Sequence, residues 1–202
     1  MRRYMNILVL LVAVPILTSC AGMADSMNKM AGIGVISEDI ATFDGAKTIK
    51  VSPNWLYESK ETWSPNEVQL GTRWKNTSPD LVVLDFFYGS DASGYSATYL
   101  GLSGMDLNVD GEKLSYSTGK STSLDSSGYN TVSKTIYTSS QNSVVIPLSV
   151  LTKMVESEDA RLRIYTSKGY EDSIFNIERS SSGQSAALLS IREFLARVHV
   201  EN

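Results

Sequence analysis

Cysteine and histidine are nearly absent from this chain: its 202 residues include one Cys and one His. A single Cys cannot form a disulfide within the chain, so the disulfide-stabilised frameworks of small secreted domains are excluded. One His and one Cys also cannot supply the ligands of the usual zinc sites. We therefore expect a core held together by packing alone, and no cofactor.

Positive charge is scarce as well. Lys and Arg number 18 against 22 Asp and Glu, so the net charge is −4. Proteins that bind nucleic acid neutralise phosphates with clustered Lys and Arg, and we expect no nucleic-acid partner here. With 42% hydrophobic and 20% charged residues, the chain has the composition and length of one globular domain.

Long hydrophobic runs are missing too. The apolar run over residues 7–17 spans 11 residues and contains Pro15. A transmembrane helix needs roughly 18 to 20 apolar residues, so this run is too short to cross a membrane permanently. It follows Arg2 and Arg3 and ends in small residues, which is the pattern of an export signal. We predict a cleaved signal peptide over residues 1–19.

The end of that signal carries the most specific motif in the sequence. Leu17-Thr18-Ser19-Cys20 resembles the lipobox of bacterial lipoproteins, in which cleavage precedes the Cys and the Cys is then acylated. The resemblance implies lipidation of Cys20, with the membrane as a partner through the lipid anchor. Because Ala21 and Gly22 follow the Cys and no Asp does, it also implies sorting to the outer membrane of the cell envelope, with the domain facing the periplasm. The alternative is an ordinary secretory signal with an incidental Cys.

The mature chain is predicted to begin with a tether over residues 20–45, followed by one β-rich globular domain over residues 46–202. Three methionines stand at helical spacing in the tether: Met23, Met27 and Met30. Glycines interrupt the segment, so a flexible tether is the first interpretation. The alternative is a short amphipathic helix whose Met stripe docks on lipid or on a partner.

Alternating apolar residues predict a mainly antiparallel β fold. Residues 47–52 and 67–75 alternate, and residues 81–88 form a nearly continuous apolar run typical of a central strand. The turn formers of residues 76–80 predict a hairpin between the last two strands. Residues 89–104 are expected to be a long surface loop.

The C-terminal third adds helices to this pattern. Pro147 is expected to open a helix that runs to about Ser157, and Ser181-x-x-Gln184 forms a possible capping box for a closing helix that ends near Val198. Between the two helices, a turn at Lys168-Gly169 predicts a hairpin with Leu162 opposite Phe175 and Tyr165 opposite Asp172. The predicted fold class is α+β, sandwich-like, with one helix before and one after this hairpin.

An aromatic cluster is the strongest candidate for a ligand surface. Trp55, Tyr57, Trp63 and Trp74 fall within 20 residues and are flanked by charged side chains. Aromatic rings with polar rims hold sugars and peptides in many proteins, so Trp55, Tyr57 and Trp63 are candidate ligand-binding residues. The competing interpretation, which we favour, assigns these rings to the core.

The segment Asp106-Leu107-Asn108-Val109-Asp110-Gly111 matches the first half of an EF-hand calcium loop. The match then fails, because Ser117 stands where a bidentate Glu is required. A β-hairpin turning at Asp110-Gly111 explains the same alternation. Calcium binding by Asp106, Asn108 and Asp110 is kept as the weaker alternative.

Catalytic patterns are not assembled in the sequence. His199 lies at the end of the closing helix, where a general base rarely finds an orienting carboxylate and a nucleophile. We therefore expect a non-catalytic envelope protein that engages a protein partner. The alternatives are a glycan-, peptide- or lipid-binding module that uses the aromatic cluster, and, less favoured, a hydrolase that depends on carboxylates.

Overall fold

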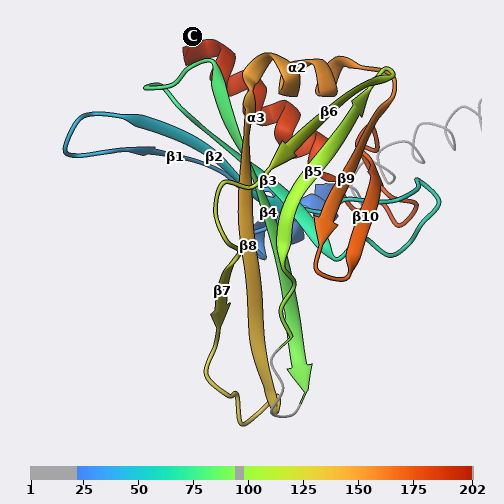
Figure 1. Cartoon of the computed structure of the whole chain (residues 1–202). Helices are drawn as coiled ribbons and strands as arrows, with labels where there is room; N and C mark the ends of the chain where they lie inside the picture. The colour runs from blue at the N-terminus through green and yellow to red at the C-terminus, as the bar shows by residue number, and fades with distance from the viewer. Residues whose placement is uncertain (1–21, 94–97, 202) are drawn as a thin grey trace, which may run out of the picture.

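The computed structural model describes residues 22–93 and 98–201; the predicted signal peptide and Cys20 lie outside these residues. Within them the chain is an α+β domain built mainly from antiparallel strands in two sheets that pack together (Figure 1). This confirms the predicted fold class, including one helix before and one helix after the C-terminal hairpin. None of the described helices is long and apolar enough to cross a bilayer.

The larger sheet has six strands in the order β1-β2-β3-β4-β8-β7, all pairs antiparallel. β4 lies near its centre, as the apolar run of this strand predicts, because both of its edges are paired. The strands are β1 (Ile36–Ile40), β2 (Lys47–Asn54), β3 (Val68–Lys75), β4 (Leu81–Ser93), β7 (Ser123–Ser126) and β8 (Thr135–Pro147).

The smaller sheet has four strands in the order β10-β9-β5-β6, again all antiparallel. Its strands are β5 (Leu102–Val109), β6 (Glu112–Ser117), β9 (Ala160–Thr166) and β10 (Gly169–Ile174). Asp110 and Gly111 both have positive φ at the β5–β6 turn, which is the backbone that a two-residue hairpin requires. The hairpin predicted at this point is confirmed.

The main core is formed by the inner faces of both sheets together with one face each of α2 (Leu148–Glu156) and α3 (Ala187–Glu201). The alternation predicted for residues 67–75 is confirmed, since one face of β3 is buried and meets the apolar side chains of β4 across the ladder. These cross-strand pairs are Val68 with Tyr88, Leu70 with Phe86, Thr72 with Leu84 and Trp74 with Val82, all buried. Side chains directly opposite one another on a buried face are the main stabilising contacts of an antiparallel pair.

The predicted tether over residues 20–45 is wrong for most of its described part. Residues 22–30 form a helix, here called the N-terminal helix, and residues 36–40 form β1. β1 pairs with β2 along its whole length, so the folded domain begins well before residue 46. Gly34 is buried at the junction, where a Cβ would lie 2.8 Å from the Asn54 side-chain nitrogen.

Three local predictions are also corrected. Residues 89–93 and 102–104 are strand rather than loop, because β4 and β5 extend into this segment. The β9–β10 hairpin turns at Ser167-Lys168, so Leu162 pairs with Ser173 and Tyr165 pairs with Tyr170. The shift of two positions leaves each side chain on its predicted face. Finally, α3 begins at Ala187, three residues after Gln184, so Ser181 does not cap it.

Candidate functional site

The structure does not assemble the aromatic cluster into one surface. Trp74 is buried in the main core, where its indole nitrogen donates a hydrogen bond to the Pro79 carbonyl at 2.9 Å. Tyr57 is fully buried in a second, small cluster with Ile177, and Trp55 packs against that cluster. Trp63 stands apart with 71% of its surface exposed. Of the three candidate ligand residues, only Trp63 offers most of its ring to solvent.

The segment that contains Trp55 and Tyr57 leads from β2 to β3 and lies against the start of α3. The Trp55 carbonyl accepts the first backbone N–H of α3, from Ala187, at 2.8 Å. The Tyr57 hydroxyl donates to the side chain of Gln184 at 3.3 Å, and burial raises the pKa of Tyr57. Trp55 and Tyr57 thus bond the first N–H of α3 and the loop that precedes this helix, which gives both residues a structural role.

The three residues of the calcium alternative are occupied by separate partners. The Tyr165 hydroxyl donates to Asp106 at 2.5 Å and holds the pKa of that carboxyl below its ordinary value. The Asn108 side chain accepts the Gly111 N–H at 3.0 Å, and Asp110 accepts the Asp159 N–H at 3.1 Å. Across residues 22–93 and 98–201 no group of three or more Asp, Glu, His or Cys is placed to hold a metal ion.

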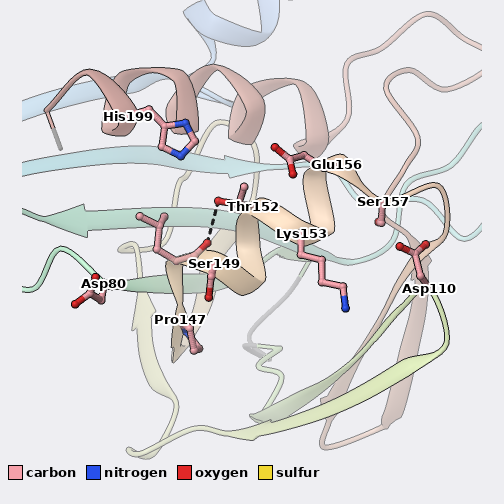
Figure 2. Close-up of a pocket in the computed structure, with 10 residues that line it drawn as sticks. Asp80, Asp110, Pro147, Ser149, Thr152, Lys153, Glu156, Ser157 and His199 are labelled. Atoms are coloured by element: carbon pink, nitrogen blue, oxygen red, sulfur yellow. Dashed lines mark hydrogen bonds between the residues drawn. The ribbon is translucent and has the colours of Figure 1, made fainter.

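An open groove of about 650 Å³ lies between α2 and the end of α3 (Figure 2). His199 points into it from α3, opposite Thr152 and Glu156 of α2. The Thr152 hydroxyl donates to the Leu148 carbonyl at 3.1 Å, and none of the described residues makes a hydrogen bond with the His199 ring. Among the described residues that line the groove, His199 and Thr152 thus form no nucleophile–base hydrogen bond.

A second groove, about 490 Å³, lies on the outer face of the smaller sheet. Arg163 lies in it, and its guanidinium binds both carboxylate oxygens of Asp172 at 2.7 and 2.8 Å and stacks on the Tyr170 ring at 3.9 Å. The ion pair lowers the pKa of Asp172. The lining carries three acidic and three basic side chains: Glu58, Asp106, Asp172, Lys113, Arg161 and Arg163. Sequence reasoning missed this groove because the predicted register put Asp172 opposite Tyr165 instead of Arg163.

The N-terminal helix is attached to the domain through its polar side chains. Arg179 forms a two-point ion pair with Asp25, at 2.9 and 2.6 Å, and both groups are about two-thirds buried. Asn28 donates to Ser185 at 3.3 Å, and Lys29 lies 3.7 Å from Glu193. The three methionines of the predicted stripe face away from the domain, with exposed fractions of 63% for Met23, 65% for Met27 and 88% for Met30.

The β1–β2 hairpin, here called the β1–β2 arm, forms one edge of the larger sheet, where β2 pairs with β3, and its turn at residues 41–46 stands out from that edge (Figure 1). Its strands are braced near the turn by the last turns of α3. Lys47 binds Glu38 at 3.0 Å and Glu201 at 2.7 Å, and Arg197 binds Glu38 at 3.2 Å. These bonds lower the pKa of Glu38 and raise that of Lys47.

The end of the β1–β2 arm is apolar. Phe43 is fully exposed and Ile40 is 62% exposed, next to the turn that connects the two strands. Large apolar side chains gathered at an exposed site are a common mark of an interaction surface.

Comparisons with protein-family models, with curated proteins and with solved structures gave no match for this chain. A functional proposal therefore has to be supported by the surfaces described above.

Proposed function

We propose that this chain is a lipid-anchored, non-catalytic protein of the bacterial outer membrane, whose β domain docks onto another envelope protein in the periplasm. The lipobox at Leu17-Thr18-Ser19-Cys20 supports the anchor. The N-terminal helix supports it further, because its first described residue follows Cys20 by two positions and its attachment to Arg179 keeps the domain close to that point. Acyl chains contribute about 0.8 kcal/mol per buried methylene, so two or three chains anchor a protein stably.

The single observation that carries the docking half of the proposal is the exposed Phe43 on the braced β1–β2 arm. Aromatic side chains that enter a partner's pocket contribute most of the binding energy at many protein interfaces. The ion pairs between Glu38, Lys47 and α3 hold the arm in place before binding, which reduces the entropy lost when the complex forms. A rigid arm with an apolar end therefore suits a protein partner with a complementary apolar pocket.

The anchor is tested with Cys20→Ser in cells. The variant is expected to leave the membrane fraction and appear in the soluble periplasmic fraction. Unchanged membrane fractionation would refute the lipid anchor.

Docking is tested with a photocrosslinking amino acid at Thr42, beside Phe43. A discrete adduct is expected from Thr42, and none from Asp125 on the exposed edge strand β7, which serves as the control position. Adding Phe43→Ser to the Thr42 crosslinker should abolish the adduct without changing the melting temperature, because the ring contacts only solvent in the isolated protein. An adduct that survives Phe43→Ser would remove the arm from the proposal.

A ligand-binding module is the second candidate, and the groove on the smaller sheet favours it. Equal numbers of acidic and basic side chains line this groove, and Arg163 is already held by Asp172 and Tyr170. Such a lining offers many donors and acceptors without net charge, which suits an uncharged polyhydroxyl ligand such as a neutral glycan. Titration with neutral oligosaccharides, comparing the native chain with Arg161→Ala, tests this. No binding to the native chain would remove the candidate.

A further inference from the structure

The exposed methionine stripe of the N-terminal helix is unusual, because an amphipathic helix ordinarily turns its apolar face to the protein core. Here Asp25 and Asn28 face the domain, while Met23, Met27 and Met30 face away from it. The polar contacts fix the rotation of the helix about its own axis. The stripe therefore cannot turn inward while the Asp25–Arg179 ion pair is intact.

The rest of that outer face is compatible with an apolar surrounding. Ser26 lies between the methionines, and its hydroxyl donates to the Gly22 carbonyl one turn earlier at 2.9 Å. A hydroxyl with an internal acceptor loses less on leaving water than a free one. Lys29 points away from the stripe, 3.7 Å from Glu193 of α3, so neither charged side chain of residues 22–30, Asp25 or Lys29, lies within the stripe.

We propose that the Met23–Met27–Met30 stripe lies on the same bilayer that holds the acyl chains of Cys20, so that the domain is mounted in one orientation instead of swinging on its anchor. This inference rests on the proposed lipid anchor. Met23 is three residues from Cys20, and three residues span at most about 11 Å even when fully extended, so an anchored Cys20 brings the stripe to the membrane surface. Methionine is flexible and apolar, which lets it fill irregular spaces between headgroups and chains.

The orientation matters for the β1–β2 arm. α3 contacts the N-terminal helix through Glu193 and the arm through Glu201 and Arg197. A stripe seated on the bilayer would thus fix the direction of the arm through one rigid helix. The surface that contacts the bilayer and the surface that docks the partner then belong to one rigid unit with a fixed orientation to the membrane.

The test uses the lipidated full chain in phosphatidylcholine vesicles that contain brominated lipid as a fluorescence quencher. An environment-sensitive fluorophore is attached at Met27→Cys or, as the matched control, at Lys29→Cys. Position 29 is two residues farther from Cys20 than position 27, about 3 Å along the helix axis, and the two point about 160° apart around the helix. The seated stripe predicts quenching at position 27 that exceeds quenching at position 29 by about threefold or more. Equal quenching at both positions, or none at either, overturns the proposal.

A second measurement uses the native side chains. Met105 and Met154 are fully buried and serve as internal controls for oxidation by hydrogen peroxide. In vesicles, oxidation of Met27 and Met30 should slow by about fivefold relative to the soluble Cys20→Ser form, while the buried pair stays slow in both. An unchanged oxidation rate of Met27 and Met30 in vesicles overturns the proposal that the stripe contacts the bilayer. Protection in native membranes but not in pure lipid vesicles assigns the stripe to a protein and also overturns it.

Failure of the anchor is distinguishable from failure of the stripe. If Cys20 carries no lipid, the chain does not float with vesicles at all, and the proposed function fails first. If the chain floats with the vesicles but the labels at positions 27 and 29 are quenched equally, the lipid anchor is supported and only the proposed contact between the stripe and the bilayer is refuted.

Discussion

Arg179 and Asp25 form a two-point ion pair with Nη1···Oδ1 and Nη2···Oδ2 distances of 2.9 and 2.6 Å, across a sequence separation of 154 residues. The Arg179 guanidinium also donates to the Gly183 carbonyl at 3.0 Å, so its orientation is set by the loop that precedes α3. Two parallel charge-assisted bonds hold both groups in a defined geometry. The pair is therefore the principal attachment of the N-terminal helix to the domain.

Asp25→Asn should release this helix without unfolding the sheets. The substitution keeps the side-chain shape and removes the charge, and a pair that is one-third exposed contributes on the order of 1 kcal/mol. Amide hydrogen exchange of residues 22–34 should accelerate by roughly fivefold while exchange in β3 and β4 is unchanged.

Glu178→Gln is the matched control, because it breaks the nearby Glu178–Arg192 surface pair at 2.6 Å without touching the helix. Equal exchange in the two variants would show that Asp25 does not hold the helix.

Acid should detach the same helix. The bonds from Arg179 lower the pKa of Asp25 in the folded chain below its ordinary value of 3.8. A carboxyl with a depressed folded pKa stabilises the fold above its unfolded pKa and loses that contribution as pH falls through the folded pKa. The attachment should thus be complete at pH 5 and above and weaken progressively below about pH 4.

Hydrogen exchange or limited proteolysis of residues 22–34 between pH 6 and pH 3 measures this loss. In Asp25→Asn the same segment should already be loose at pH 6 and should change little on acidification. An identical pH profile in both proteins would assign the transition to other carboxyl groups.

Much of the fold was predictable where one face of a strand meets the core. Val68, Leu70, Thr72 and Trp74 alternate in the sequence and are all buried, because burial of one face imposes a period of two. Leu151 and Met154 likewise follow from helical spacing. The Asp110-Gly111 turn was predictable because Gly and Asp tolerate positive φ.

The strands that were missed have no buried face of that kind. In β1, Glu38, Asp39 and Ile40 are all exposed, and order comes from pairing with β2 and from ion pairs to Lys47 and Arg197. The outer half of β4 is paired with the Ser- and Thr-rich start of β8. Neither strand carries the apolar alternation that marks a strand in sequence.

The candidate sites depended on pairings that sequence spacing does not record. Arg163 meets Asp172 only because the β9–β10 turn falls at Ser167-Lys168; moving the turn by one position shifts the pairing by two and separates the two residues. Asp25 meets Arg179 only in the folded chain. The aromatic cluster shows the converse case, since Trp63 and Trp74 are close in sequence but have opposite exposure.

That difference gives a stability prediction for the two tryptophans. Trp74→Ala removes a fully buried ring and its bond to Pro79, and it should lower the free energy of unfolding by about 3 to 5 kcal/mol. Trp63→Ala removes a ring that is 71% exposed and should change stability by less than about 0.5 kcal/mol. Urea denaturation followed by far-ultraviolet circular dichroism measures both. A large decrease in the free energy of unfolding of Trp63→Ala would show that this ring makes a contact that stabilises the fold.

Two glycines give the sharpest test of the smaller sheet. At Gly104 a Cβ would lie 2.5 Å from the Tyr116 carbonyl oxygen, which is backbone of the neighbouring strand β6. β5 is paired with β6 on one edge and with β9 on the other, so the strand has little freedom to move away. Gly104→Ala should therefore cost about 2 kcal/mol or more in the free energy of unfolding, since the clash is with backbone and not with a mobile side chain.

Gly119→Ala is the matched control for this clash. A Cβ at Gly119 meets no atom within 4 Å, and its φ is not positive. The substitution should leave stability unchanged or raise it by up to about 1 kcal/mol, because alanine restricts the unfolded chain more than glycine does. Thermal and urea unfolding of both variants give the comparison. Equal stabilities would mean that β5 and β6 can separate at Gly104 without loss, and that the polar groove on the outer face of this sheet is less rigid than the Arg163–Asp172 pair implies.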